Sequence, residues 1–145
     1  MIRTAVAADL PELQRVFRAA SLSNVDDAPL LLERPEFLVF AGHGIAEGRT
    51  RVAVEGDRVL GFATVVMDDE GPDLEDLFVD PECHRRGVAR RLIEDAVARL
   101  KGQGHQALTV TGNPHALEFY RAVGFVEIGE AGTELGPAPR LRKEL

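Results

Sequence analysis

The chain has little of what extracellular and membrane proteins usually need. Its 145 residues include one cysteine, one tyrosine and no tryptophan. A single cysteine cannot form an internal disulfide, which fits a reducing compartment, so we expect a cytoplasmic protein. No apolar run approaches the length of a membrane span, and the first residues lack the charged and then apolar order of a signal peptide. The sequence therefore predicts a soluble protein with no membrane partner.

The chain also has fewer basic than acidic residues. Lys and Arg number 17 against 24 Asp and Glu, which gives a formal net charge of −7. An acidic chain repels phosphate backbones, which argues against nucleic-acid binding and favours cationic or neutral partners. The four histidines are not spaced as metal ligands, so no metal is expected. At this length one hydrophobic core is sufficient, and no repeat or linker divides residues 1–145 into more than one domain.

Two common phosphate-binding signatures, Gly-Lys-Ser/Thr and Gly-x-Gly-x-x-Gly, are absent. The chain has instead an apolar run at residues 77–79, a basic turn, and apolar positions at helical spacing after Gly87. Pro81 cannot continue a central strand, so the turn begins there. The unpaired N–H groups and partial positive charge at the start of the helix suit a phosphate or pyrophosphate. Gly87 lets the anion approach the backbone without a side chain in the way.

The turn resembles the acyl-CoA pyrophosphate loop of the GNAT superfamily of N-acetyltransferases. That family has Gln/Arg-x-x-Gly-x-Gly/Ala, where residues 84–89 read His-Arg-Arg-Gly-Val-Ala, so the first position departs. The resemblance implies that acetyl-CoA is held largely by backbone amides. Arg90 is either a phosphate contact or a residue that solvates the helix. The cofactor-binding residues implied in the loop are His84, Arg85, Arg86, Gly87, Val88, Ala89 and Arg90.

A second segment, residues 113–125, has the signals of both ends of a short helix. Asn113 suits the N-cap, Pro114 the first helical position and Gly124 the position after the last turn. The segment resembles the family's Asn-x-x-Ala-x-x-Phe-Tyr-x-x-x-Gly-Phe at every fixed position. By resemblance Asn113 and Phe119 contact the cofactor, and Tyr120 is the general acid that protonates the departing CoA sulfur. The alternative for Tyr120 is a packed core aromatic.

The resemblance extends over essentially the whole chain and implies one α/β domain. The expected fold is a mixed, mostly antiparallel central sheet of about six or seven strands with about four helices on its faces. Local patterns agree, with a capping box at residues 9–12 opening the first helix. A second helix is expected over residues 30–40, interrupted at Pro35. The expected strands are residues 2–6, 51–54, 59–67, 73–79, 107–111 and 125–128, with an edge strand near 140–145.

The resemblance also implies direct acetyl transfer from acetyl-CoA to a primary amine in a ternary complex. In the family the pantetheine pairs with the strand before the loop, here Leu77, Phe78 and Val79. A backbone N–H of that strand can polarise the thioester carbonyl. Glu75 resembles the position of the family's base, acting directly or through a water, and a merely solvated carboxylate is the alternative. Cys83 is expected to be structural, because the family transfers the acetyl group directly.

The sequence does not name the acceptor. Asp26, Asp27 and Asp76 are expected to bind it, because carboxylates attract a cationic amine, although they can equally solvate an acidic surface. The acceptor can be a small molecule, a peptide N-terminus or a protein lysine. Whether the chain forms a homodimer is also open. The alternative function is a non-catalytic acyl-CoA-binding sensor of the same fold, followed by an unrelated anion-binding domain. Segments expected around the acceptor are residues 21–27, 30–40 and 129–142.

Overall fold

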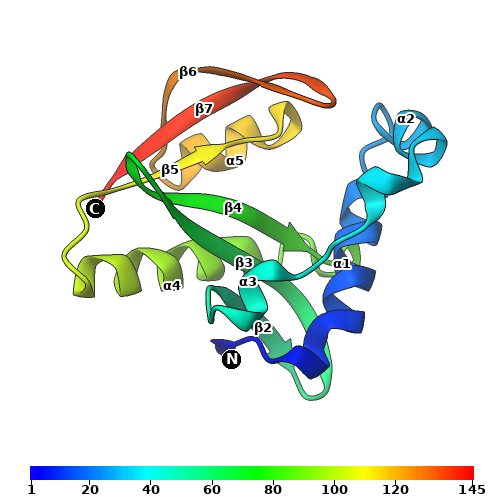
Figure 1. The fold of residues 1–145 in the computed structure, drawn as a ribbon, viewed down its shortest axis with the longest axis horizontal. Helices are drawn as coiled ribbons and strands as arrows, with labels where there is room; N and C mark the ends of the chain where they lie inside the picture. Colours follow the sequence, from blue (N-terminus) through cyan, green and yellow to red (C-terminus); the bar gives the residue numbers. More distant parts are fainter.

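The computed structural model describes all 145 residues, and a seven-stranded sheet organises them (Figure 1). The strand order is β1-β2-β3-β4-β5-β7-β6. Every neighbouring pair is antiparallel except β4 and β5, which are parallel. This confirms the expected mixed, mostly antiparallel sheet. The strands are β1 (Ile2–Thr4), β2 (Thr50–Glu55), β3 (Arg58–Asp68), β4 (Gly71–Val79), β5 (Ala107–Thr111), β6 (Val126–Thr133) and β7 (Gly136–Glu144).

Five α-helices and four short 3₁₀ segments connect the strands. None of the helices combines the length and the apolar character that crossing a bilayer demands. The α-helices are α1 (Leu10–Leu22), α2 (Ala28–Glu33), α3 (His43–Ala46), α4 (Val88–Gly102) and α5 (Leu117–Ala122). The 3₁₀ segments are η1 (Ala7–Asp9), η2 (Pro35–Leu38), η3 (Pro81–Cys83) and η4 (Pro114–Ala116).

Two buried clusters hold helices on opposite faces of the sheet. One contains Leu92 of α4, Tyr120 of α5 and Ala63 of β3. The other contains Leu13 of α1 and Phe62 of β3. Because neighbouring residues of a strand point to opposite faces, Phe62 and Ala63 show that α1 covers one face while α4 and α5 cover the other.

The C-terminal strand is not an edge strand, and that prediction is wrong. β7 lies between β5 and β6, and β6 forms the edge. The tight turn between β6 and β7 folds β6 onto the outer side of β7, so the inner side of β7 pairs with β5. Leu141 of β7 is completely buried, as a strand paired on both sides allows.

The predicted capping box of α1 is also wrong. The carboxylate of Asp9 makes no bond to the first turn of α1. It accepts hydrogen bonds from both terminal nitrogens of Arg3 and from the Val6 amide at 2.8–2.9 Å. Glu12 pairs with Arg15 instead. A charged partner outside the helix thus competes successfully for the carboxylate that the local pattern assigns to the cap.

The other two helical predictions hold in part. Pro35 interrupts the second helix as expected and separates α2 from η2. The segment after Asn113 divides into η4 and α5, and the Asn113 side chain accepts a hydrogen bond from the His115 amide at 2.9 Å. Gly124 ends α5 with a φ of 100°, a conformation that favours glycine.

The sheet divides in its middle. β4 and β5 pair only between Asp73 and Thr109 and between Leu74 and Val110. Farther along, β4 pairs with β3 alone. The β3–β4 register shifts between Leu74 and Asp76, so Glu75 has no partner and forms a bulge. The divergence of the two strands opens a space in the sheet next to this bulge.

Candidate functional site

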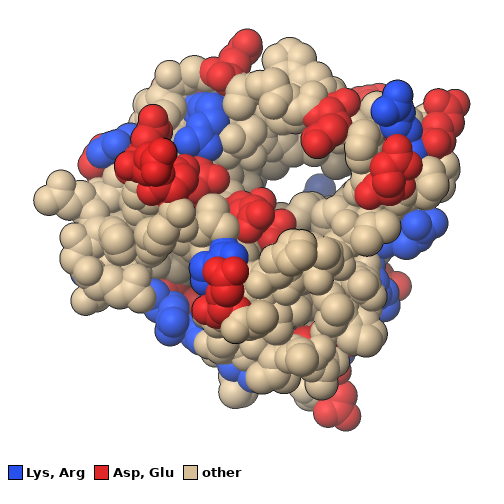
Figure 2. All heavy atoms as spheres, viewed as in Figure 1, with Lys and Arg blue, Asp and Glu red and all other residues tan.

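A groove opens where β4 and β5 separate. Its volume is about 1100 Å³. Figure 2 shows the molecule hollowed above β4, between the part built by α1 and α2 and the part built by α5 and the β6–β7 hairpin of Figure 1. Residues of all these elements line the groove. A space of this size accommodates a ligand as large as a nucleotide cofactor.

The half of β4 that β5 leaves unpaired forms one wall of the groove. Leu77, Phe78 and Val79, the residues predicted to hold pantetheine, all line it. Since β3 occupies only one edge of this half-strand, the backbone groups on the other edge can pair with an extended ligand. The ring of Phe78 packs edge-on against Phe17 of α1, with centroids 4.8 Å apart, which holds the strand against the helix.

The turn between β4 and α4 forms an end of the groove suited to an anion. Arg85 and Gly87 both have positive φ, 67° and 75°, and such alternation turns successive N–H groups toward one side. Because α4 begins at Val88 and has 15 residues, the amides of its first turn have no acceptor within the helix. Apart from the glycine and its two chain neighbours, no atom lies within 4 Å of where a Cβ of Gly87 would stand, so the space beside the backbone is open.

One predicted loop residue lies elsewhere. Arg86 does not line the groove. Its Nη2 donates to the Glu55 carboxylate at 2.6 Å and its Nη1 to the buried Cys83 sulfur at 3.9 Å, so it ties the loop to the β2–β3 hairpin. The predicted loop residues that do line the groove are His84, Arg85, Gly87, Val88, Ala89 and Arg90.

Tyr120 lies on the α5 wall of the groove, beside Asn113 and Phe119. Its ring packs against those of Phe119 and Phe125, with centroids 5.4 Å apart in each case. The hydroxyl makes no hydrogen bond within the chain, and no enclosed side-chain polar atom lacks a partner, so the hydroxyl reaches the groove. Burial raises the pKa of Tyr120 to about 12. The phenol is therefore protonated at neutral pH, as a proton donor requires.

Of the two carboxylates at the bulge, only Glu75 lines the groove. Its side chain is 54% exposed, and one oxygen lies 3.8 Å from Nη1 of Arg49. Asp76, predicted to bind the acceptor, is half-buried beside Thr64 outside the groove lining. Burial raises the pKa of Asp76 to about 6, and the charge of Glu75 adds to this, while a hydrogen bond from Thr64 acts in the opposite direction.

We expect Asp76→Asn to stabilise the protein at pH 8 and to leave it unchanged at pH 4. A carboxyl whose pKa rises on folding, here from 3.8 to about 6, holds its proton more tightly in the folded state. Stability therefore falls as the pH rises from about 4 to about 6 and then levels off, because ionisation is easier in the unfolded chain. The amide removes this penalty, so the free energy of unfolding at pH 8 should increase by about 1–2 kcal/mol.

Urea unfolding of the wild type and of Asp76→Asn at the two pH values checks this. Equal stability of Asp76→Asn and the wild type at pH 8 would show that the carboxyl carries no burial penalty.

Carboxylates and apolar side chains share the open end of the groove. Asp27 lies there, with its Oδ2 3.6 Å from Nε2 of His115 on the opposite wall. Asp26, predicted together with Asp27, is exposed and does not line the groove. The turn between β6 and β7 contributes residues that the sequence indicated only as part of a long segment. The other lining residues at this end include Phe17, Glu36, Phe37, Val39, Glu134 and Leu135.

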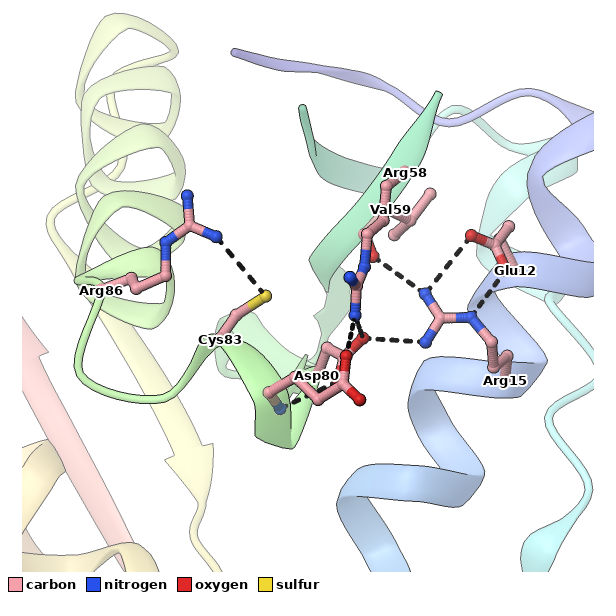
Figure 3. A network of polar contacts seen from close by, with 8 residues as sticks. Glu12, Arg15, Arg58, Val59, Asp80, Cys83 and Arg86 are labelled. Atoms are coloured by element: carbon pink, nitrogen blue, oxygen red, sulfur yellow. Dashed lines mark hydrogen bonds and ion pairs between the residues drawn. The ribbon is translucent and has the colours of Figure 1, made fainter. Parts of the chain in front are cut away.

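A buried carboxylate outside the groove joins the loop to the rest of the molecule (Figure 3). Asp80 follows β4 directly, and its side chain is 3% exposed. It accepts hydrogen bonds from Arg15 at 2.8 Å, from Arg58 at 2.9 Å and from the Glu82 amide at 3.0 Å. Burial alone would raise the pKa of Asp80, but these three donors lower it to about 2. No sequence pattern indicated this group, since its members lie far apart in the chain.

Known proteins resemble this chain in sequence. The sequence profile of the family described as Acetyltransferase (GNAT) domain matches residues 42–136. Mycothiol acetyltransferase of Rhodococcus erythropolis (strain PR4 / NBRC 100887) is 36% identical over 92 residues. Those residues are 62% of this chain and 29% of that protein, so the chain spans only a minor part of this relative's length.

Solved structures resemble it in fold. A PaiA N-acetyltransferase from Thermoplasma acidophilum, solved with coenzyme A, superposes with a TM-score of 0.75 at 16% identity, covering 100% of this chain and 98% of the other. The ribosomal-protein-S18-alanine N-acetyltransferase of Escherichia coli superposes with a TM-score of 0.71 at 19% identity, covering 99% of this chain and 92% of the other. At these identities the likeness shows the shared fold.

Proposed function

The chain belongs to the GNAT acetyltransferase family, and from that premise we propose that its groove binds acetyl-CoA and transfers the acetyl group to a primary amine. One observation carries the proposal: a protonated Tyr120, the unpaired edge of β4 and the free amides at the start of α4 all border the same groove. The three provide a proton donor, a partner for an extended chain and an anion site. Residues 1–145 would act as a single domain.

Acetyl-CoA would lie along the groove. In this proposal the amides around Gly87 and the side chains of Arg85 and Arg90 hold the pyrophosphate, as helix N-termini and guanidinium groups hold phosphates elsewhere. The free edge of β4 at residues 77–79 pairs with the pantetheine amides, which places the thioester near Tyr120. Acetyl-CoA supplies an activated acyl group, and the chain supplies orientation and proton transfer.

Three groups of the chain would act on the reacting atoms. Glu75, directly or through a water, accepts a proton from the ammonium so that the amine can attack the thioester carbonyl. A backbone N–H of β4 donates to the carbonyl oxygen as negative charge develops there. Tyr120 donates its proton to the sulfur as the carbon–sulfur bond breaks, so CoA leaves as a thiol, and the second proton that the attacking nitrogen loses restores the phenol. The amine gains the acetyl group in one direct transfer.

The acceptor in this proposal is a positively charged amine on a small molecule or a peptide. Asp27, Glu36 and Glu134 surround the open end of the groove together with Glu75. Several carboxylates in one cleft concentrate cations and hold an ammonium until a base removes its proton. A sequence relative is named for mycothiol, a small molecule, which is consistent with a small-molecule acceptor.

We expect Asp27→Asn to raise the acceptor KM about three- to tenfold at low ionic strength and to leave the KM for acetyl-CoA unchanged. The reason is that Asp27 borders the groove and attracts the cation, an effect that salt screens. Asp26→Asn is a matched control, because it removes the same charge from the adjacent position outside the groove lining. Initial rates at varied salt measure both. Identical acceptor KM values for the two variants would contradict the acidic groove mouth.

The alternative is a non-catalytic sensor that binds acyl-CoA in the same groove but does not transfer the acyl group. Release of CoA thiol from acetyl-CoA in the presence of a panel of amines separates the two. The proposed enzyme releases thiol only when an acceptor amine is present and yields the N-acetylated amine by mass spectrometry. Tight acetyl-CoA binding with no amine-dependent release across cationic, peptide and neutral amines would favour the sensor.

A further inference from the structure

We propose that Asp80 is a positioning residue that, with Arg15 and Arg58, fixes the start of the cofactor loop and thereby sets the affinity for CoA. The inference rests on the proposed function, since it assigns a role in CoA binding to residues that do not line the groove. We call these three residues the Asp80 network. It joins α1 and β3 to the point where β4 ends and the loop begins (Figure 3).

Hydrogen bonds hold both the backbone and the side chain of Asp80. The Asp80 amide donates to the Leu60 carbonyl at 2.8 Å, and the Asp80 carbonyl accepts from the Cys83 amide at 2.8 Å. The carboxylate accepts from Nη1 of Arg15, from Nη2 of Arg58 and from the Glu82 amide. These bonds fix the direction in which the chain leaves β4 and the orientation of the first loop amide. The backbone at the start of the loop is therefore held in one conformation by several independent hydrogen bonds.

The rest of the loop has few backbone hydrogen bonds to hold its shape. Between Asp80 and α4 the remaining backbone bonds are those of the His84 and Arg86 amides, each at 3.3 Å. Arg85 has a φ of 67°, which is uncommon for a residue with a side chain and must be held by its surroundings. The loop is thus held at α4, at the Asp80 network and, through Arg86, at Glu55 of the β2–β3 hairpin. A shift at Asp80 would move the amides that face the pyrophosphate.

The same network connects the loop to the strand proposed to hold pantetheine. Arg15 belongs to α1. Phe17, two residues further along the same helix, lines the groove and packs against Phe78 of β4. Arg15 also donates to the Val59 carbonyl at 3.1 Å, and Arg58 also pairs with Glu82. α1 thus contacts both the strand proposed to hold pantetheine and the residue at the root of the loop. Helix α1 therefore sets the position of β4 relative to the start of the loop.

The composition of the network favours positioning over stability. A buried carboxylate between guanidinium groups loses its hydration, and well-packed apolar residues of similar volume often stabilise a protein as much or more. An apolar group at position 80, however, could not orient the Glu82 amide or hold two elements at hydrogen-bond distance. What the carboxylate provides is a fixed geometry.

The test compares Arg58→Gln and Arg15→Gln with Arg3→Gln. Arg3 is the matched control, because it also binds an aspartate through two nitrogens near α1 but makes no contact with the loop. We expect the dissociation constant for CoA and the KM for acetyl-CoA to rise about tenfold in the first two variants, because displaced loop amides bind the pyrophosphate poorly. The values of kcat and the acceptor KM should stay within about twofold of the wild type.

Two further measurements separate positioning from a loss of stability. Arg15→Lys retains the charge and one donor, so it should recover part of the CoA affinity that Arg15→Gln loses, even if both unfold at similar temperatures. Amide hydrogen exchange in residues 82–87 should accelerate in Arg58→Gln while exchange in β3 and α4 stays unchanged. A structural role alone would lower stability and leave the KM for acetyl-CoA intact.

The possible outcomes are distinct. A wild-type protein that fails to bind CoA would overturn the proposed function and this inference with it. Normal CoA affinity in folded Arg58→Gln and Arg15→Gln, alongside normal wild-type binding, would overturn the inference alone. A tenfold loss that Arg3→Gln shares would also overturn it, since the effect would then not depend on the loop.

Discussion

Tyr120→Phe should lower kcat about 100-fold or more and leave CoA binding unchanged, as expected for the loss of a general acid. The substitution removes only the hydroxyl, which makes no hydrogen bond within the chain, and keeps the ring that packs against Phe119 and Phe125. The fold should therefore survive intact. Because burial raises the pKa of Tyr120 to about 12, the wild-type phenol carries its proton throughout the neutral range and supplies it to the leaving sulfur.

Single-turnover rates with saturating acetyl-CoA measure this effect, because they isolate the chemical step from product release. Calorimetric titration with CoA and the melting temperature serve as controls for binding and folding. A single-turnover rate equal to that of the wild type would reject Tyr120 as the acid, and a parallel loss of CoA affinity would point to a packing role instead.

Gly87→Glu should reduce the affinity for CoA about 100-fold or more, since like charges brought together cost several kcal/mol and each 1.4 kcal/mol is a factor of ten. Gly87 has a φ of 75° and stands directly before the first turn of α4, so a side chain there enters the space that the pyrophosphate is proposed to occupy. The negative charge would also occupy the helix N-terminus in place of the ligand.

Gly104→Glu is the control for both the charge and the backbone strain. Gly104 lies just beyond the other end of α4, has a φ of 87° and has open space beside it, as Gly87 does. It should bind CoA as the wild type does. If a folded Gly87→Glu protein bound CoA with wild-type affinity by calorimetry, the pyrophosphate would have to bind elsewhere.

The sequence predicts well those features that depend on residues close together in the chain. The turn before α4, the helical spacing after Gly87 and the Asn113 cap all depend on neighbours within a few positions. Such local signals also carry the family resemblance, which is why the mixed sheet agrees with expectation and most of the residues predicted to bind the cofactor border one groove. Tyr120 is found for the same reason, since its segment matches the family pattern without a gap.

What the sequence cannot supply are contacts between distant positions. Arg15 and Asp80 are 65 residues apart, and nothing in either neighbourhood indicates that they meet. The bulge at Glu75 decides which carboxylate borders the groove, and it depends on the β3–β4 register. Asp26 and Asp27 look alike in the sequence, but only Asp27 turns toward the groove.

The order of the last strands also depends on contacts between distant positions. Whether β7 is an edge strand depends on which strand of the hairpin, β6 or β7, pairs with β5. That choice also brings the turn residues Glu134 and Leu135 to the groove, where the charge of Glu134 joins the acidic end. A pattern of alternation within each strand gives no information on this pairing.

The structure of the protein crystallised with CoA tests the central claim most directly, because it locates the pyrophosphate and the sulfur in one measurement. The account predicts pyrophosphate oxygens within hydrogen-bond distance of the amides around Gly87. It also predicts pantetheine paired with residues 77–79 of β4, and the sulfur within reach of the Tyr120 hydroxyl. CoA bound away from the β4–β5 opening, or bound there with its sulfur directed away from Tyr120, would contradict it.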